Sequence, residues 1–275
     1  MARRPTFGDE PKSRLAAWSG RLALFGLAVA ALSIIIVRSG LLEIIPALAT
    51  FGAALVLAAV AILFSFAGFI VIWRQGLSGL GSAILGLIVG LMLLGYPGYL
   101  AYRASRLPAI SDITTDPSNP PRFDVLARLR PRGSSDYPGA AVARQQTAAY
   151  PDVAPLQLNV PIKVAYDATL ALVNKRKWHV VDARPPGAGR RDAVIEAVAR
   201  TPIMGFRDDV VIRVTATREG ARVDMRSASR YAWHDFGTNA SRIRSLLEDL
   251  DDSVGATPEP RPEQKSQPPR GQPAK

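Results

Sequence analysis

The chain has 275 residues, a net charge of +11, two histidines and no cysteine. The lack of cysteine excludes disulfides, a Cys nucleophile and thiolate-ligated metals, and two histidines are too few for a His-rich site, so we expect no metal and no cofactor. The basic residues are mostly arginines without a dense run, which predicts either a generic basic surface or contact with anionic membrane lipids, and no binding of nucleic acid.

Three long apolar stretches occupy residues 18–37, 44–73 and 80–101. Each reaches the roughly 20 residues that a helix needs to cross about 30 Å of hydrocarbon. In lipid the backbone must satisfy its own hydrogen bonds, so each stretch should be helical. No acidic or basic residue lies deep within them, whereas transporters usually need one. Residues 18–101 are therefore predicted to be a three-helix transmembrane anchor.

Lysine and arginine are distributed unequally between the two ends of these stretches. If the basic segment 1–17 is cytoplasmic, the inner side holds Arg3, Arg4, Lys12, Arg14, Arg21 and Arg74, and the outer side holds Arg38, Arg103 and Arg106. Basic residues favour the cytoplasmic side of a membrane protein. The bias predicts a cytoplasmic N-terminus, and three crossings then place the remainder of the chain outside the cytoplasm.

The third apolar stretch carries small residues on one helical face, at Ser82, Gly86 and Gly90. Such stripes let helix backbones approach closely. We expect this one to pack against the other two helices of the same chain, with homo-oligomerisation through it as the less favoured alternative.

The composition changes after residue 101. Residues 102–160 are predicted to be a Pro-rich stalk and lead-in, and residues 255–275 a disordered tail. Between them, 161–254 has the periodicity of a compact core: a helix at 161–177, strands at 178–183, 193–200, 208–217 and 221–229, and a helix at 238–251. This order predicts an α+β domain, an antiparallel sheet with flanking helices, preceded by three transmembrane α-helices.

One segment of this core, residues 206–243, is dense in polar groups. Its residues match a recurring pattern in three blocks: Phe206, Asp208, Asp209 and Val210; Arg226, Ser227, Ser229 and Arg230; Asp235, Gly237, Asn239, Arg242 and Ile243. In order and spacing these blocks resemble the bacterial family known as domain of unknown function 1499, over roughly residues 108–252. Many members carry an Asn-Cys-Val-Ser-Ser segment near the domain start, where this chain has residues 116–120 without cysteine. The resemblance implies a fold unit and no activity.

Two interpretations of the polar segment remain open. Arginine guanidinium groups, together with neutral hydrogen-bonding side chains, can bind a carboxylate or a phosphate. The candidate ligand-binding residues are therefore Arg226, Ser227, Ser229, Arg230, Asn239 and Arg242. Aspartates in the same segment favour an internal ion-pair and capping network, with Asp208, Asp209 and Asp235 as its members. Because the turn at 218–220 brings the ends of two strands together, we expect Asp208 to be coupled to Arg226 and Arg230.

A catalytic site is the weakest reading of these residues. The residue types of a Ser–His–Asp triad are present in Ser227 or Ser229, His234 and Asp235, but neither serine lies in a nucleophile-elbow motif. We therefore assign no catalytic residue and predict a membrane-anchored envelope protein. It would lie in the bacterial inner membrane, with a periplasmic domain that binds an anionic ligand or envelope protein without catalysis. The alternative is a membrane-anchored hydrolase that uses segment 206–243.

Overall fold

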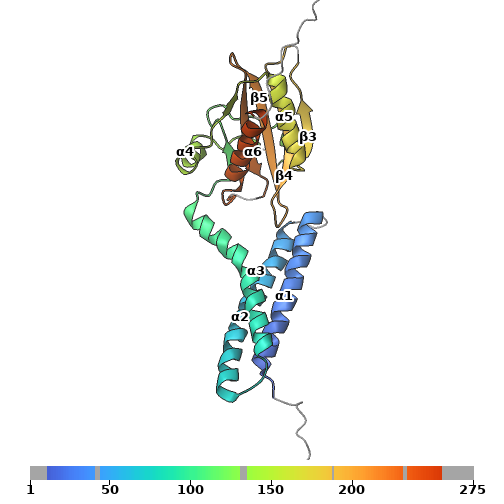
Figure 1. The fold of residues 1–275 in the computed structure, drawn as a ribbon, viewed down its shortest axis with the longest axis vertical. Helices are drawn as coiled ribbons and strands as arrows, with labels where there is room; N and C mark the ends of the chain where they lie inside the picture. The colour runs from blue at the N-terminus through green and yellow to red at the C-terminus, as the bar shows by residue number, and fades with distance from the viewer. Residues whose placement is uncertain (1–10, 41–43, 131–134, 188, 232–233, 256–275) are drawn as a thin grey trace, which may run out of the picture.

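A computed structural model describes residues 11–40, 44–130, 135–187, 189–231 and 234–255 (Figure 1). Most of the basic segment 1–17 and almost all of the predicted disordered tail, namely residues 1–10 and 256–275, lie outside the described residues.

Three N-terminal helices are long and apolar enough to cross a membrane, as the sequence predicted. They are α1 (Arg14–Ser39), α2 (Ile44–Gln75) and α3 (Leu80–Arg106). They lie side by side below the α+β domain, and the C-terminal end of α1 and the N-terminal end of α2 lie on the side of that domain (Figure 1).

Small residues hold these helices together. An added Cβ at Gly86 would lie 2.6 Å from the Ser19 hydroxyl of α1, and one at Gly90 would lie 3.0 Å from the Ala58 carbonyl oxygen of α2. The Ser19 hydroxyl also donates a hydrogen bond to the Ser82 carbonyl, at 3.2 Å. Close approach of this kind is how small-residue stripes pack in membranes. The stripe of α3 is thus covered by α1 and α2 of its own chain.

Aromatic side chains mark both ends of the helical bundle. Trp18 and Trp73 are exposed at the end away from the domain, and three exposed tyrosines, Tyr96, Tyr99 and Tyr102, follow one another along the last turns of α3. This part of α3 contains Pro97 and leans away from α1 and α2 (Figure 1). Tryptophan and tyrosine concentrate where hydrocarbon meets water, so the pattern is typical of a helix bundle with two membrane interfaces.

The described residues beyond α3 form a six-stranded antiparallel sheet in the order β1-β6-β5-β4-β3, with β2 also paired to β6. The strands are β1 (Asp112–Thr114), β2 (Leu156–Leu158), β3 (His179–Arg184), β4 (Asp192–Arg200), β5 (Arg207–Ala216) and β6 (Ala221–Ser229). The four longer strands are those that the sequence predicted, and the α+β fold class is confirmed. The three-residue strands β1 and β2 lie in the segment predicted as stalk and lead-in.

Two helices cover one face of the sheet, here called the helix face. They are α5 (Ile162–Lys175) and α6 (Thr238–Gly255), and they lie next to each other across the strands (Figure 1). The apolar stripe of α6, which includes Ile243 and Leu246, is buried against alternate residues of β4, β5 and β6. Burial of a side chain of this size contributes about 1.5–3 kcal/mol, so this layer forms the main core.

The opposite face of the sheet, here called the lead-in face, is covered by parts of the segment between β1 and α4, here called the lead-in, among them Phe123, Leu126 and Arg130. Phe123 and Leu126 pack on Val211 and Ala228 in a small second core. Leu126 begins η1 (Leu126–Leu129), a short 3-10 helix. The helix α4 (Ala140–Ala149) follows, and its Gln146 side chain exchanges hydrogen bonds with the backbone of Thr114. The lead-in is thereby bound to the sheet along much of its length.

Candidate functional site

The carboxylate of Asp235 organises the start of α6 on the helix face. It accepts hydrogen bonds from the backbone N–H groups of Gly237, at 2.8 Å, and Asn239, at 2.7 Å. Phe236 and Gly237 both have positive φ, which turns the chain sharply into the helix. Burial raises the pKa of Asp235, while these N–H groups act in the opposite direction. Asp235 is therefore a capping residue, and it occupies the helix N-terminus that an anion would need.

Asn239 lies at the centre of the polar contacts between α6 and β6. Its side-chain oxygen accepts from the Ser227 hydroxyl at 2.7 Å, and its side-chain nitrogen donates to the Ser229 hydroxyl at 3.0 Å. Arg242 also contacts Ser227 and Asn239, and it forms an ion pair with Asp208 at 2.5 Å. All of these side chains are buried or nearly so. Four of the six predicted ligand-binding residues thus contact one another in a closed layer.

Arg226 lies on the lead-in face and is almost completely buried. It forms two hydrogen bonds with the Asp112 carboxylate and donates to the backbone carbonyls of Pro121 and Ser135. Its guanidinium also lies 4.7 Å from the centroid of the Phe123 ring. Nearby, burial together with the charge of Asp112 raises the pKa of Tyr137 to about 12. Arg226 therefore connects the lead-in to the sheet.

Asp209 forms a second ion-pair cluster on this face. Its carboxylate contacts Arg230 at 2.7 Å and Arg130 at 3.0 Å. Arg130 also donates to the Ser229 carbonyl at 2.7 Å, and burial lowers the pKa of Arg130. Asp208 and Asp209 point to opposite faces, as expected for neighbours on a strand.

The expected coupling of Asp208 to Arg226 and Arg230 was wrong. Asp208 is directly opposite Ser229, whereas Arg226 is opposite Val211. Opposed residues of an antiparallel pair share a face, so Arg226 lies on the lead-in face and Asp208 on the helix face. Asp208 pairs with Arg242 instead, and Arg226 pairs with Asp112.

The Ser–His–Asp set written from the sequence does not assemble. Both serine hydroxyls contact Asn239, and the Asp235 carboxylate accepts from backbone N–H groups. The Nδ1 atom of His234 accepts from the backbone N–H of Phe236, and its ring stacks on Phe236. A nucleophile needs a base within hydrogen-bonding reach, and these contacts provide none.

A second group of residues lies where the α+β domain meets the helical bundle, here called the junction. The loop between β4 and β5, residues 201–206, reaches down to the ends of α1 and α2 (Figure 1). Met204 is buried with Val37 of α1 and Ala47 of α2, and Ile203 and Phe206 pack around them. The Arg38 guanidinium donates to the carbonyls of Pro202 and Ile203, at 2.8 and 3.1 Å.

Three arginines gather at the junction. Arg200 donates to the backbone carbonyl of Arg38 at 2.8 Å, near the C-terminal end of α1. An added Cβ at Gly40, the residue that caps α1, would lie 3.3 Å from the guanidinium of Arg207. Within the described parts of the chain, no carboxylate forms an ion pair with Arg38, Arg200 or Arg207. Among the described residues, the charges of these three arginines are therefore not compensated by an ion pair.

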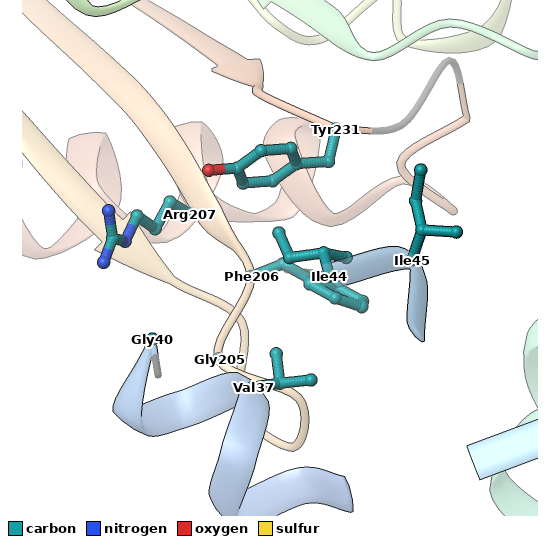
Figure 2. Close-up of a pocket in the computed structure, with 8 residues that line it drawn as sticks. All are labelled: Val37, Gly40, Ile44, Ile45, Gly205, Phe206, Arg207 and Tyr231. Carbon is teal, nitrogen blue, oxygen red and sulfur yellow. The ribbon is translucent and has the colours of Figure 1, made fainter. Parts of the chain in front are cut away.

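A cavity of about 360 Å³ opens at the same place (Figure 2). It is lined by the end of α1, the start of α2, the residues that lead into β5, and a residue shortly after β6, as follows: Val37, Gly40, Ile44, Ile45, Gly205, Phe206, Arg207 and Tyr231. The Tyr231 hydroxyl points toward the side on which Arg207 lies, and Ile45 lies at the other end (Figure 2). One end of the cavity is thus polar and the other apolar.

A family model described as a protein of unknown function, DUF1499, matches residues 112–250, about half of the chain. The chain belongs to the DUF1499 family. None of the curated proteins matches it. The DUF1499 match begins at β1 and ends within α6, so it comprises the sheet, the lead-in, α5 and most of α6. The resemblance noted in the sequence is confirmed.

The DUF1499 motif residues divide between the two faces of the sheet. The junction, in contrast, combines a loop inside the DUF1499 match with Arg38, Gly40 and Ile44 from the anchor outside it. Sequence reasoning missed this site. One signal was available: residues 202–206 are Pro, Ile, Met, Gly and Phe, an apolar run in a turn between two strands, where polar residues are the rule.

Proposed function

We propose that this DUF1499 protein is a membrane-anchored envelope protein whose α+β domain lies outside the cytoplasm and binds an anionic ligand or an acidic partner without catalysis. The observation that carries the proposal is the charge at the junction. Arg38, Arg200 and Arg207 meet there without an ion-pairing carboxylate among the described residues. A guanidinium fork suits carboxylate and phosphate, and a partner anion would supply the missing countercharge.

The predicted ligand-binding residues have a different role in this proposal. We assign Arg226, Ser227, Ser229, Arg230, Asn239 and Arg242 to the internal network, together with Asp208, Asp209 and Asp235. Their hydrogen bonds run to one another and to the backbone in buried layers. An incoming ligand would have to break contacts that already compensate each charge, at a cost of several kcal/mol per ion.

The hydrolase alternative has little support from these contacts. It requires a free nucleophile or an activated water near a base, and both serines and the aspartates of segment 206–243 are engaged elsewhere. Binding without catalysis accounts both for the internal network of segment 206–243 and for the junction arginines that have no ion-pairing carboxylate among the described residues.

Two experiments test the proposal. The full chain, purified from membranes in mild detergent, should retain an anionic molecule that native mass spectrometry and lipid extraction identify. Retention of neutral molecules alone would contradict it. An alkaline phosphatase fusion after Tyr150 should be active, because the proposed orientation places that residue outside the cytoplasm. An inactive fusion, with a bright cytoplasmic fluorescent reporter at the same position, would reverse the orientation.

A further inference from the structure

We propose that the junction cavity binds the headgroup of an anionic phospholipid from the leaflet next to the domain, with the lipid chains leaving along Ile45. The inference rests on the proposed function and specifies its ligand. Its basis is the position of the cavity along the helices, the chemistry of its polar end and the exposure of its apolar end.

The cavity lies at the level where lipid headgroups are found. Val37 belongs to the last turn of α1, Gly40 caps that helix, and Ile44 and Ile45 begin α2. Both helices exceed the roughly 20 residues that cross the hydrocarbon, so the end of α1 and the start of α2 lie at or beyond its boundary with water. A ligand in this cavity is therefore at the height of the phosphate and glycerol groups of the bilayer.

The polar end of the cavity can hold a phosphate. Arg207 is exposed and forms no ion pair with any described carboxylate, and the Tyr231 hydroxyl lies on the same side (Figure 2). Gly40 adopts a φ of 72° and has no side chain, which lets the Arg207 guanidinium lie close above the end of α1. Arg38 and Arg200 donate to neutral carbonyls, so their charges add to the local positive potential.

The apolar end distinguishes a lipid from a free anion. Val37, Ile44 and Phe206 form its wall, and the Ile45 side chain is 79% exposed beside them. An exposed apolar side chain at the start of a membrane-crossing helix suits contact with the lipid chains that extend from the headgroup. A volume of about 360 Å³ is in the range of ligand pockets and suits a headgroup with its glycerol, whereas inorganic phosphate would leave the apolar wall unused.

The test uses the full chain in detergent, freed of native lipid and titrated with phosphatidylglycerol or phosphatidylcholine. Native mass spectrometry counts the bound lipids. Arg207→Gln removes the charge at the polar end, and Ile45→Trp obstructs the apolar end without disturbing a buried contact. Arg218→Gln is the matched control, because Arg218 is an exposed arginine in the turn at the opposite end of β5.

We expect the wild-type chain to prefer phosphatidylglycerol over phosphatidylcholine, and we expect Arg207→Gln to weaken phosphatidylglycerol binding about fivefold. Ile45→Trp should weaken the binding of phosphatidylglycerol as well, and Arg218→Gln should leave it unchanged. Equal melting temperatures for the four proteins show that folding is intact. Inorganic phosphate should compete poorly.

Other results overturn the inference in distinguishable ways. Equal losses for Arg207→Gln and Arg218→Gln would indicate diffuse surface charge, and equal binding of both lipids would remove the role of the anionic headgroup. Strong competition by inorganic phosphate would replace the lipid with a free anion. Each of these outcomes leaves the proposed function intact. Failure to retain any anionic molecule, lipid or otherwise, would overturn the inference and the proposed function together.

Discussion

Arg226 on β6 and Asp112 on β1 form a two-pronged ion pair, with Nε–Oδ1 at 2.9 Å and Nη2–Oδ2 at 2.7 Å. Their side chains are 1% and 9% exposed. The same guanidinium bonds two backbone carbonyls of the lead-in, so one side chain joins β6, β1 and the covering segment. While all of these partners are present, they offset much of the desolvation free energy of the buried charge. Removal of one partner leaves the other charge uncompensated and strongly lowers the stability of the fold.

The first prediction concerns this pair. Arg226→Ala should lower the free energy of unfolding by about 3–5 kcal/mol, because it leaves the Asp112 carboxylate buried without a countercharge. Chemical denaturation of the full chain in detergent measures the loss. The double variant with Asp112→Ala should recover part of it, which a double-mutant cycle quantifies. Arg218→Ala, at an exposed turn, is the control and should change the free energy by no more than about 0.5 kcal/mol. Additive losses for Arg226 and Asp112 would show that they act independently.

A second prediction concerns Glu196 on β4, whose side chain is fully buried. Its carboxylate accepts hydrogen bonds from three successive N–H groups, those of Asp124, Val125 and Leu126, at 2.8–3.1 Å. Glu196→Ala leaves these donors without their acceptor, so the free energy of unfolding should fall by about 3 kcal/mol or more.

Hydrogen exchange locates the effect of this change. The amides of residues 124–126 should exchange much faster in Glu196→Ala, while those of α6 keep their relative protection, because the lead-in and α6 cover opposite faces of the sheet. Glu219→Ala, in the exposed turn between β5 and β6, is the matched control. Unchanged exchange at 124–126 would mean that Glu196 does not hold the lead-in.

The third prediction is a pH dependence that comes from Asp116. Burial alone would raise the pKa of this carboxyl. Hydrogen bonds from the backbone N–H groups of Asn119 and Ser118, with the charge of Arg222, lower it below the ordinary value of 3.8. A folded-state pKa below the unfolded value stabilises the domain at neutral pH, and this contribution is lost as the pH falls from 3.8 through the folded value.

Asp116→Asn isolates this contribution. The variant should be less stable than the wild type at pH 7, and the difference in free energy of unfolding should shrink as the pH falls below 3.8. Thermal melts over a pH series provide the measurement. A difference that stays constant with pH would show that the Asp116 charge contributes nothing.

The fourth prediction compares two glycines of α3. Gly86→Ala should destabilise the bundle, because the new Cβ would lie 2.6–2.8 Å from atoms of Ser19. Gly81→Ala meets nothing within 4 Å and should be neutral or slightly stabilising, since alanine is the better helix former by about 1 kcal/mol. Melting of the α-helical signal in detergent distinguishes them. If Gly86→Ala instead left melting unchanged and dissociated a dimer, the stripe would be an intermolecular contact.

The elements with a clear period could be predicted from the sequence. The three apolar helices follow from length and hydropathy alone. The sequence located β3 to β6 with ends within one residue of the structure, and alternation was clearest for β5 and β6. The stripe of α6 was equally clear, because Ile243, Leu246, Leu247 and Leu250 repeat with the helical period and are all buried.

The contacts between distant segments could not be predicted in this way. β1 and β2 have three residues each, too few to show alternation. The partner of Arg226 is Asp112, 114 positions away in a Pro-rich segment with no periodicity. The error over Asp208 has a simpler origin. Side chains alternate between the two faces along a strand, and directly opposed residues of paired strands share a face. Asp208 is opposite Ser229, three positions from Arg226, so Asp208 and Arg226 lie on opposite faces of the sheet.

The contact between Arg38 and the loop at 201–206 fixes the domain at a second point, besides its covalent attachment at the end of α3. A domain attached to the helices at one point can adopt many orientations relative to them. A domain attached at two points can rotate only about the line that joins those points. In this arrangement the surface around Arg207 and Tyr231 faces the end of α1 and the start of α2. A domain held at two points has already lost on folding part of the orientational entropy that a freely swinging domain would lose on binding to a surface, so less of this cost remains for any later contact.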